Sequence, residues 1–309
     1  MLNGYRARVL LASAATAAVL VASPLTTRAA TATGGAGSNI TGGGLVKHIF
    51  RTVQGSKGYI GVGGSAGPLL YGGGPIEKSP KVYLTYWGWH GSDPSGERPY
   101  IERFFNGVGG TSWANIQTQY TGTGQGNITN PTGQLKGTWA DDSSTPLPVI
   151  TDAAIATEAV AAEKHFGFDP DADYFVLTPT GTGTVGFKVQ YCAWHSTTTD
   201  GSKTVAFTNL PYITDAGSSC GQNFVNPGSA GTLDGVSIVG GHEYAEAVTD
   251  PQPSSGWVDA GGQENGDKCA WVSSGSGASR DISLSTGSFA VQSLWSNAAS
   301  LLGGCVISY

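Results

Sequence analysis

A histidine and two glutamates stand close together in residues 233–250, in a chain that otherwise uses few charged residues. His242, Glu243 and Glu246 fall within the run His-Glu-Tyr-Ala-Glu. Side chains four residues apart share one face of a helix and lie about 5–6 Å apart. His242 and Glu246 can therefore bind one metal ion, while Glu243 points slightly to the side.

This spacing resembles the zinc-binding helix of the zincin metallopeptidases, His-Glu-x-x-His, with glutamate in place of the second histidine. Zinc accepts carboxylate oxygen as well as imidazole nitrogen, and a catalytic zinc has three protein ligands and an open position. A third ligand must then come from elsewhere in the chain, and the candidates are His195, Asp250, Glu264 and Asp267. In the alternative interpretation, His242 caps or packs the helix and both glutamates face water.

The surroundings of the motif favour a functional helix. Two glycines immediately before His242 allow another backbone to approach closely. The helix must end by Asp250, because Pro251 disfavours helical geometry in the residue before it. The turn-rich run 264–269, Glu-Asn-Gly-Asp-Lys-Cys, carries two more carboxylates, and acidic loops near a helix often complete metal sites.

The other histidines differ as candidate ligands. His195, in the run Cys-Ala-Trp-His, either supplies the third ligand or is a polar loop residue. His90 follows an expected strand at its carboxyl end, where α/β folds gather functional groups, but we favour a surface turn. We expect His48 and His165 to be incidental.

Residues 1–32 are typical of a secretory signal peptide. Arg6 and Arg8 precede an apolar run over 9–22, and small residues follow at 27–32. The apolar run is shorter than the roughly 20 residues of a transmembrane helix. We therefore expect a secreted, extracellular protein without a membrane span.

Four cysteines lie in the C-terminal half of the chain. An even number in an oxidising compartment favours disulfides over a thiolate metal site. The sequence leaves three pairings open. We prefer Cys192–Cys220 and Cys269–Cys305, because each closes a loop of moderate length.

The composition narrows the function classes. The formal net charge is −6, and a negative balance argues against nucleic acid and anionic membranes as partners. The glycine-rich runs lack the Lys-Ser/Thr ending of a phosphate-binding loop, so nucleotide binding is not expected. Only 12% of the residues are charged and 48 are glycine, so we expect loops and strands to outweigh helices.

The patterning predicts an α/β or α+β fold. We expect a single globular domain over 76–309, with a central mixed sheet, flanking helices and a turn-rich C-terminal part that disulfides pin. The Gly-rich residues 33–75 are expected to form an irregular lead-in. Strands are expected over 81–89, 173–179 and 204–207, and helices over 98–105, 112–120, 151–165 and 233–250.

Several separated blocks follow one another in a recognisable order. They are Leu-Leu-Tyr-Gly-Gly-Gly-Pro at 69–75, Lys-Val-Tyr-Leu-Thr-Tyr-Trp-Gly at 81–88, Cys-Ala-Trp-His at 192–195, Asp-Gly-Val at 234–236, the 242–251 motif and the 264–269 run. This order resembles the plant EXORDIUM or phosphate-induced-protein family and its bacterial secreted relatives. The resemblance covers residues 66–272 and implies an extracellular, wall-associated protein linked in plants to growth, without a defined reaction. The chain departs from the plant pattern at Asp250 and in its Gly-rich front.

Two functions from different classes follow. The first is a secreted zinc-dependent hydrolase, a metallopeptidase with a protein or peptide substrate. Glu243 would be its general base, acting on a water whose pKa the zinc lowers. The second is a noncatalytic extracellular protein, associated with a cell-wall polymer or glycan, with a structural ion. An oxygen-rich set of ligands would favour calcium, and a set containing histidine zinc. We favour the hydrolase, because a glutamate directly after the histidine ligand suits a water-activating base.

Overall fold

The computed structural model describes residue 1 and residues 37–42, 44–57 and 67–309. The chain divides into a unit of residues 1–32 and a unit of residues 33–309, and the account below concerns the second. Apart from Met1, the signal-peptide prediction lies outside the described residues. Within these ranges, no helix combines the length and apolar character needed to cross a membrane.

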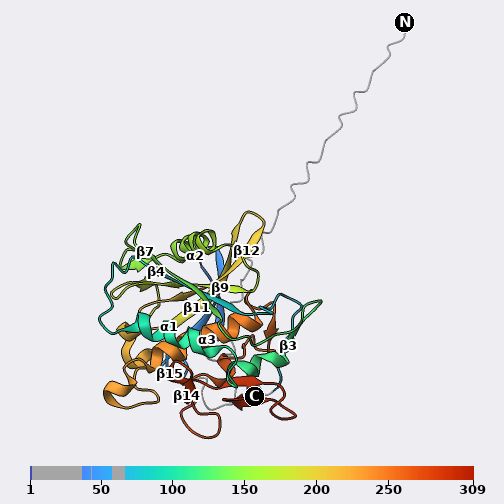
Figure 1. The fold of residues 1–309 in the computed structure, drawn as a ribbon. Coiled ribbons are helices and arrows are strands. Elements are labelled where there is room, and N and C mark those ends of the chain that lie inside the picture. The colour runs from blue at the N-terminus through green and yellow to red at the C-terminus, as the bar shows by residue number, and fades with distance from the viewer. Residues whose placement is uncertain (2–36, 43, 58–66) are drawn as a thin grey trace. The chain divides into compact units, whose positions relative to one another are not determined.

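A seven-stranded mixed sheet forms the centre of the second unit (Figure 1), in the order β1-β2-β11-β12-β9-β4-β7. Its strands are β1 Gly37–Gly42, β2 Leu45–Arg51, β4 Lys81–Trp87, β7 Leu135–Asp141, β9 Ala172–Leu177, β11 Tyr191–Asp200 and β12 Lys203–Leu210. Strands β12, β9, β4 and β7 run parallel. Strand β11 is antiparallel to β12, and the β1–β2 hairpin extends the sheet antiparallel beyond β11. The predicted mixed α/β fold with a central sheet is confirmed.

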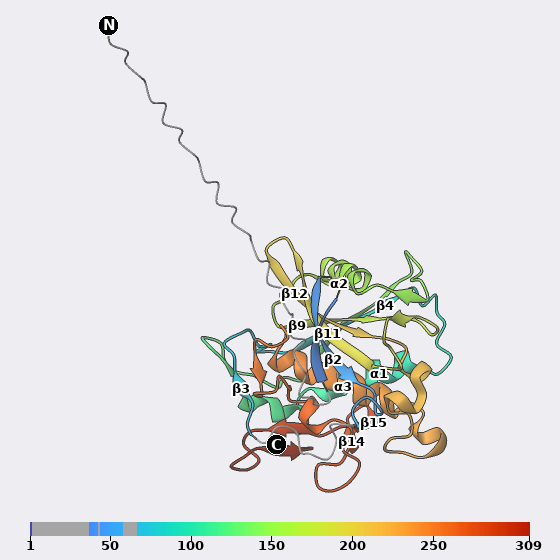
Figure 2. The ribbon, with the colours of Figure 1, turned by 180° about the vertical axis from the view of Figure 1, so that it is seen from behind.

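Helices cover both faces of this sheet (Figures 1 and 2). Helix α2 (Asp152–Phe166) packs on one face, and helices α1 (Glu97–Val108) and α3 (Asp234–Thr249) lie on the other. The start of α2 agrees with its sequence, because Thr151 accepts a hydrogen bond from the backbone N–H of Ala154. Burial from both sides explains why every residue of β9 is buried.

Helix α3 is the predicted helix over 233–250, and it is buried at all 16 positions. The interpretation in which its glutamates face water is therefore wrong. Gly240 permits the close packing, because a Cβ there would lie 2.9 Å from Cδ1 of Ile101 on α1. The helix is enclosed between the sheet and other parts of the protein, so its polar side chains need hydrogen-bond partners or ions inside the protein.

The prediction of an irregular lead-in is wrong for residues 37–51. They form the β1–β2 hairpin, and β2 pairs with β11 so that Phe50 lies opposite Ala193. Residues 45–51, Leu-Val-Lys-His-Ile-Phe-Arg, hold the β-branched and aromatic residues of a strand, but neighbouring glycines obscured this signal. The ordered domain thus begins well before residue 76, while residues 58–66 of the predicted lead-in lie outside the described ranges.

Two other segments also differ from the predictions in their local structure. Residues 112–120 hold a 3-10 helix, η1 (Ala114–Gln119), in place of an α-helix. The run 192–195 belongs to strand β11, which the sequence analysis did not expect. Both local patterns are short, so tertiary packing decides their conformation.

The C-terminal part is turn-rich and disulfide-pinned, as predicted. Bonds Cys192–Cys220 and Cys269–Cys305 are both present, which confirms the preferred pairing. The remaining 3-10 helices are η2 Ile213–Cys220, η3 Gly228–Gly231 and η4 Asp267–Cys269. The remaining strands are β3 Leu70–Tyr71, β5 Thr121–Gly122, β6 Gly126–Asn127, β8 Val149–Ile150, β10 Gly183–Thr184, β13 Trp257–Val258, β14 Arg280–Leu284, β15 Gly287–Val291, β16 Leu294–Ser296 and β17 Gly304–Val306.

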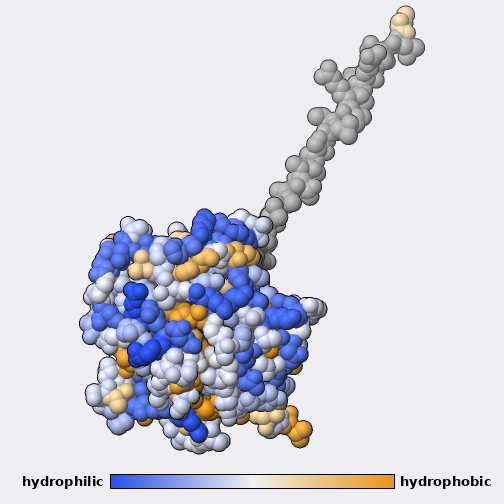
Figure 3. Space-filling model, in the orientation of Figure 1, coloured by the Kyte–Doolittle hydropathy of each residue, from blue (hydrophilic) through white to orange (hydrophobic). Residues whose placement is uncertain are grey.

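Polar residues dominate the visible surface (Figure 3), and the largest fully buried side chains are aromatic. The face seen in Figure 3 is mostly hydrophilic or weakly polar, and its apolar residues form small separate groups. Many large aromatic side chains lie inside, among them Trp113, Trp194 and Trp271. Charged side chains inside such a core are unusual unless they are paired or bind an ion.

Candidate metal centre

Seven ionisable side chains meet in the core where helix α3 faces strands β2 and β11. Each is between 0% and 4% exposed. They are His48 from β2, His195 from β11, His242, Glu243 and Glu246 from α3, Glu264 from the preceding loop and Asp267 from η4. Six of them are predicted site residues, brought together from distant parts of the chain.

One group of three candidate ligands consists of His48, Glu246 and Asp267, and we call it the His48 triad. Nε2 of His48 lies 2.7 Å from Oδ2 of Asp267 and 4.0 Å from Oε2 of Glu246. His242 flanks this triad, because its Nε2 lies 3.1 Å from Oε1 of Glu246 and 3.7 Å from Oδ1 of Asp267. Ligands about 2.0–2.2 Å from a zinc ion in tetrahedral geometry are separated by roughly 3.3–3.6 Å, which is close to these spacings.

A second group, the His195 triad, consists of His195, Glu243 and Glu246. Nδ1 of His195 lies 3.2 Å from Oε2 of Glu243 and 3.8 Å from Oε2 of Glu246. Glu246 therefore belongs to both triads. The predicted pairing of His242 with Glu246 across one helical turn is also present.

Side-chain oxygen atoms lie within 3.2 Å of Nδ1 of His48 and of His242, the ring nitrogens that point away from the His48 triad. Nδ1 of His48 lies 2.9 Å from Oδ1 of Asn39 and 3.2 Å from Oε1 of Glu264. Nδ1 of His242 lies 3.2 Å from Oε1 of Gln292, whose amide nitrogen donates to the carbonyl of Gly266. Nδ1 of His242 therefore donates to Gln292 and leaves Nε2 with a lone pair, whereas Nε2 of His48 is itself hydrogen-bonded to Oδ2 of Asp267 at 2.7 Å. Histidines that bind metal ions are held in the way that His242 is.

Several buried polar atoms of the cluster have no hydrogen-bond partner within the described part of the chain. They are Nε2 of His195 and His242, Oε1 of Glu243, Oε2 of Glu246, both Oε atoms of Glu264 and Oδ1 of Asp267. Leaving one buried polar group unsatisfied costs about 1–3 kcal/mol. These atoms are nitrogen and carboxylate donors, and a metal ion would satisfy those that line the triads. The residues present therefore fit a metal ion.

The protonation of the histidines suits metal binding. Burial, together with the charges of His48 and His242, lowers the pKa of His195 well below its usual value. Burial also lowers the pKa of His242 to about 4, against the opposing charge of Asp267. Burial alone would lower the pKa of His48, but the charge and hydrogen bond of Asp267 and the charge of Glu246 raise it. At neutral pH, His195 and His242 are therefore neutral and can act as ligands.

The carboxyl groups of the cluster are difficult to ionise together. Burial, followed by neighbouring carboxylates, raises the pKa of Glu243, Glu246 and Glu264 well above the usual range. Such shifts mean that ionising these groups together is costly in the protein interior. A divalent cation would remove that cost.

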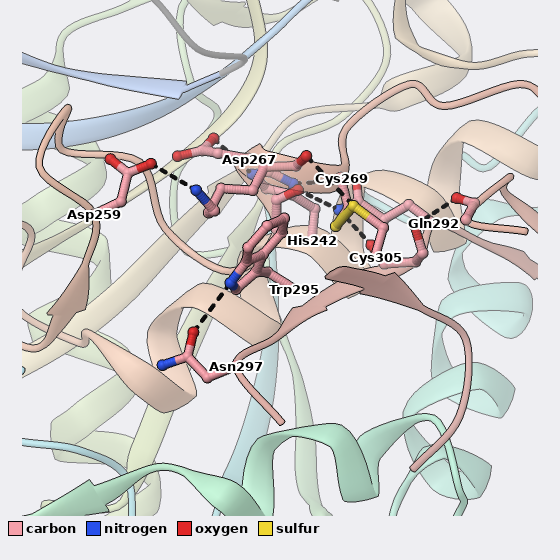
Figure 4. Close-up of a disulfide and its surroundings, with 12 residues drawn as sticks. His242, Asp259, Asp267, Cys269, Gln292, Trp295, Asn297 and Cys305 are labelled. Carbon is pink, nitrogen blue, oxygen red and sulfur yellow. Dashed lines mark hydrogen bonds and ion pairs between the residues drawn. A yellow bond between two sulfur atoms is a disulfide. The ribbon is translucent and has the colours of Figure 1, made fainter. Parts of the chain in front are cut away.

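A glycine allows the acidic loop to reach helix α3. A Cβ on Gly266 would lie 2.7 Å from Nδ1 of His242 and 2.9 Å from Oε1 of Glu246. The backbone N–H of Asp267 donates to Oε1 of Glu246 at 3.0 Å. Figure 4 shows the Cys269–Cys305 disulfide beside His242 and Asp267. The hydrogen bond holds the loop against the helix, and the disulfide joins the end of the loop to strand β17.

Asp250 is the predicted ligand that lies outside the cluster of seven side chains, whereas His242 and Glu264 belong to the cluster but to neither triad. Its carboxylate accepts backbone N–H bonds from Ser254, Ser255 and Gly256 at 2.8, 3.1 and 2.7 Å. The side chain therefore shapes the turn after α3. His90 also lies apart, with half of its side chain exposed, in agreement with the expected surface turn.

His48 is the member of the cluster that the sequence analysis missed. The expectation that it is incidental is wrong, because the pairing of β2 with β11 places it opposite His195 inside the cluster. The strand-like run over 45–51 was the signal that could have identified it. His165, the other histidine expected to be incidental, stacks on Trp139 instead.

Comparison of the chain with models of protein families, with curated proteins and with solved structures finds no match in any of the three. The candidate centre therefore rests on its geometry and chemistry.

Proposed function

We propose that this protein is an exported metalloprotein that holds zinc in its core. The observation that carries the proposal is the set of buried donor atoms without hydrogen-bond partners around Glu246. Three imidazoles among the donors favour zinc over calcium, which prefers oxygen ligands throughout. Two disulfides support an oxidising, extracellular location.

The burial of the cluster favours a structural role for the ion. A peptidase must bring an extended chain to a metal-bound water, but the ligands here are 0–4% exposed. An ion would join strand β2, strand β11, helix α3 and the 264–267 segment. It would thus act as a cross-link between distant parts of the sequence, and its binding free energy would add to folding stability.

One observation supports a zinc-dependent hydrolase as the second candidate. Glu243 directly follows His242, and its Oε1 accepts no hydrogen bond. A carboxylate at this place could take a proton from water near the ion. Zinc would supply the Lewis acid that makes the water acidic. The substrate would be a protein or peptide, admitted by a movement that uncovers the cluster.

Elemental analysis of protein purified without chelator tests the proposal. We expect stoichiometric zinc in the wild-type protein and a lower zinc content in His242→Ala, with His90→Asn as the control. Asn suits that position, because His90 has a φ of 46° and lies outside the cluster. Stoichiometric calcium would overturn the assignment of zinc, and a folded protein that binds no metal would overturn the proposal.

A cleavage assay separates the two candidates. We expect the zinc-loaded, folded protein to leave a library of unfolded proteins intact. Cleavage that is lost in Glu243→Gln would instead favour the hydrolase, since removing a general base lowers rates by about 10²–10⁴-fold.

A further inference from the structure

We infer that the centre binds two divalent cations, one in the His48 triad and one in the His195 triad, with Glu246 as the ligand they share. The inference rests on the proposed metal binding and specifies its stoichiometry.

The position of Glu246 carries this inference. Its Oε2 lies 4.0 Å from Nε2 of His48 and 3.8 Å from Nδ1 of His195, and it accepts no hydrogen bond. Its other oxygen, Oε1, lies 3.1 Å from Nε2 of His242. The carboxylate thus faces a histidine nitrogen of each triad. Protein sites with two metal ions place them about 3.5–4 Å apart, a separation that one carboxylate spans.

Each triad also has donors of its own. Asp267 belongs to the His48 triad and Glu243 to the His195 triad. Oδ1 of Asp267 and Oε1 of Glu243 are both buried and without a hydrogen-bond partner. An ion held by one triad alone would leave the unpartnered oxygen of the other triad without a partner.

The charge of the cluster points the same way. Glu243, Glu246, Glu264 and Asp267 bring four carboxyl groups into the core. Two divalent cations match the charge of four carboxylate ligands, whereas one cation matches the charge of two. Lys268, the next residue after Asp267, places its ammonium 2.8 Å from Asp259.

Glu264 lies beside the outward-facing ring nitrogens of both His48 and His195. Its Oε1 lies 3.2 Å from Nδ1 of His48, and its Oε2 lies 3.6 Å from Nε2 of His195. These are the ring nitrogens that face away from the triads. One carboxylate therefore lies behind a histidine of each triad.

The number of zinc ions bound per chain tests the inference. The protein is stripped of metal with a chelator, reloaded with zinc and freed of unbound zinc. We then expect two zinc ions per wild-type chain, one per chain in Glu243→Gln and one per chain in Asp267→Asn. Glu102→Gln is the control and should retain two, because Glu102 lies apart on α1 and pairs with Arg98. One zinc in the wild-type protein would overturn the two-ion centre and leave the proposed function intact. No zinc would overturn both.

A second measurement needs no variant and so does not depend on whether the variants fold. X-ray absorption at the zinc edge of the fully loaded wild-type protein should show zinc–zinc scattering at about 3.5–4 Å. A spectrum with nitrogen and oxygen neighbours and no second zinc at that distance would contradict the inference.

Discussion

His48 and His195 lie directly opposite each other on the antiparallel strands β2 and β11, with their ring centroids 5.5 Å apart. This cross-strand pair supplies one histidine to each triad. The β1–β2 hairpin at the edge of the sheet is thus part of the candidate centre, although it lies far from α3 in the sequence.

Replacing His48 tests the role of this hairpin. We expect His48→Gln to weaken zinc binding in the His48 triad by at least about 100-fold, since even outer partners of a ligand contribute 10–100-fold. Competition with a chromophoric chelator measures the affinity. His165→Gln is the control, because that ring is exposed and stacks on Trp139. Equal affinities in the two variants would remove His48 from the centre.

The loop around Gly266 gives a second prediction. In Gly266→Ala the new methyl group would contact His242 and Glu246 and push the loop away from α3. Zinc affinity should fall, while far-ultraviolet circular dichroism stays close to wild type. Gly304→Ala is the matched control, because its Cβ would meet that of Ala299 at an ordinary 3.5 Å. An unchanged affinity in Gly266→Ala would show that the loop does not need this close approach.

The two disulfides should differ in their effect on the centre. Removing either one by Cys→Ser replacement should cost about 2–5 kcal/mol of unfolding free energy. Loss of Cys269–Cys305 should also weaken zinc binding, because η4 carries both Asp267 and Cys269. Loss of Cys192–Cys220 should affect zinc less, since strand pairing holds His195 in β11. Urea denaturation and zinc titration of both double variants measure the difference, and the reverse order would contradict this account.

A carboxyl pair away from the centre predicts a pH dependence of stability. Burial, followed by the charge of Asp141 and a hydrogen bond to it, raises the pKa of Glu158 to about 8. Between about pH 4.5 and 8 the folded protein keeps a proton that the unfolded chain has lost, so this group's stabilising contribution falls as pH rises. Glu158→Gln should therefore flatten the decrease in the urea midpoint between pH 5 and pH 8.5. A slope equal to that of wild type would show that Glu158 does not titrate there.

Elements with strong local signals could be predicted from the sequence. Helix α2 has a capping Thr151 and an alanine-rich interior, and strand β4 has a dense run of β-branched and aromatic residues. The His242–Glu246 pair follows from helical periodicity alone. Cysteine count and loop length also led to the disulfide pairing that the structure contains.

Features that depend on long-range pairing could not be predicted in this way. His48 enters the centre only because β2 pairs with β11, which lies about 150 residues further along the chain. The register of this pairing places His48 opposite His195. Asp250 has a ligand's chemistry, but the backbone N–H groups of the following turn bind its carboxylate. Neither outcome is encoded in local residue patterns.

Anomalous X-ray scattering from crystals of the protein, recorded above and below the zinc edge, tests the central claim most directly. The account predicts zinc peaks in the core beside Glu246, about 2.0–2.1 Å from a nitrogen of His48 and of His195. A well-ordered crystal of protein prepared with zinc that shows no anomalous peak among these residues, or peaks only at the surface, would contradict it.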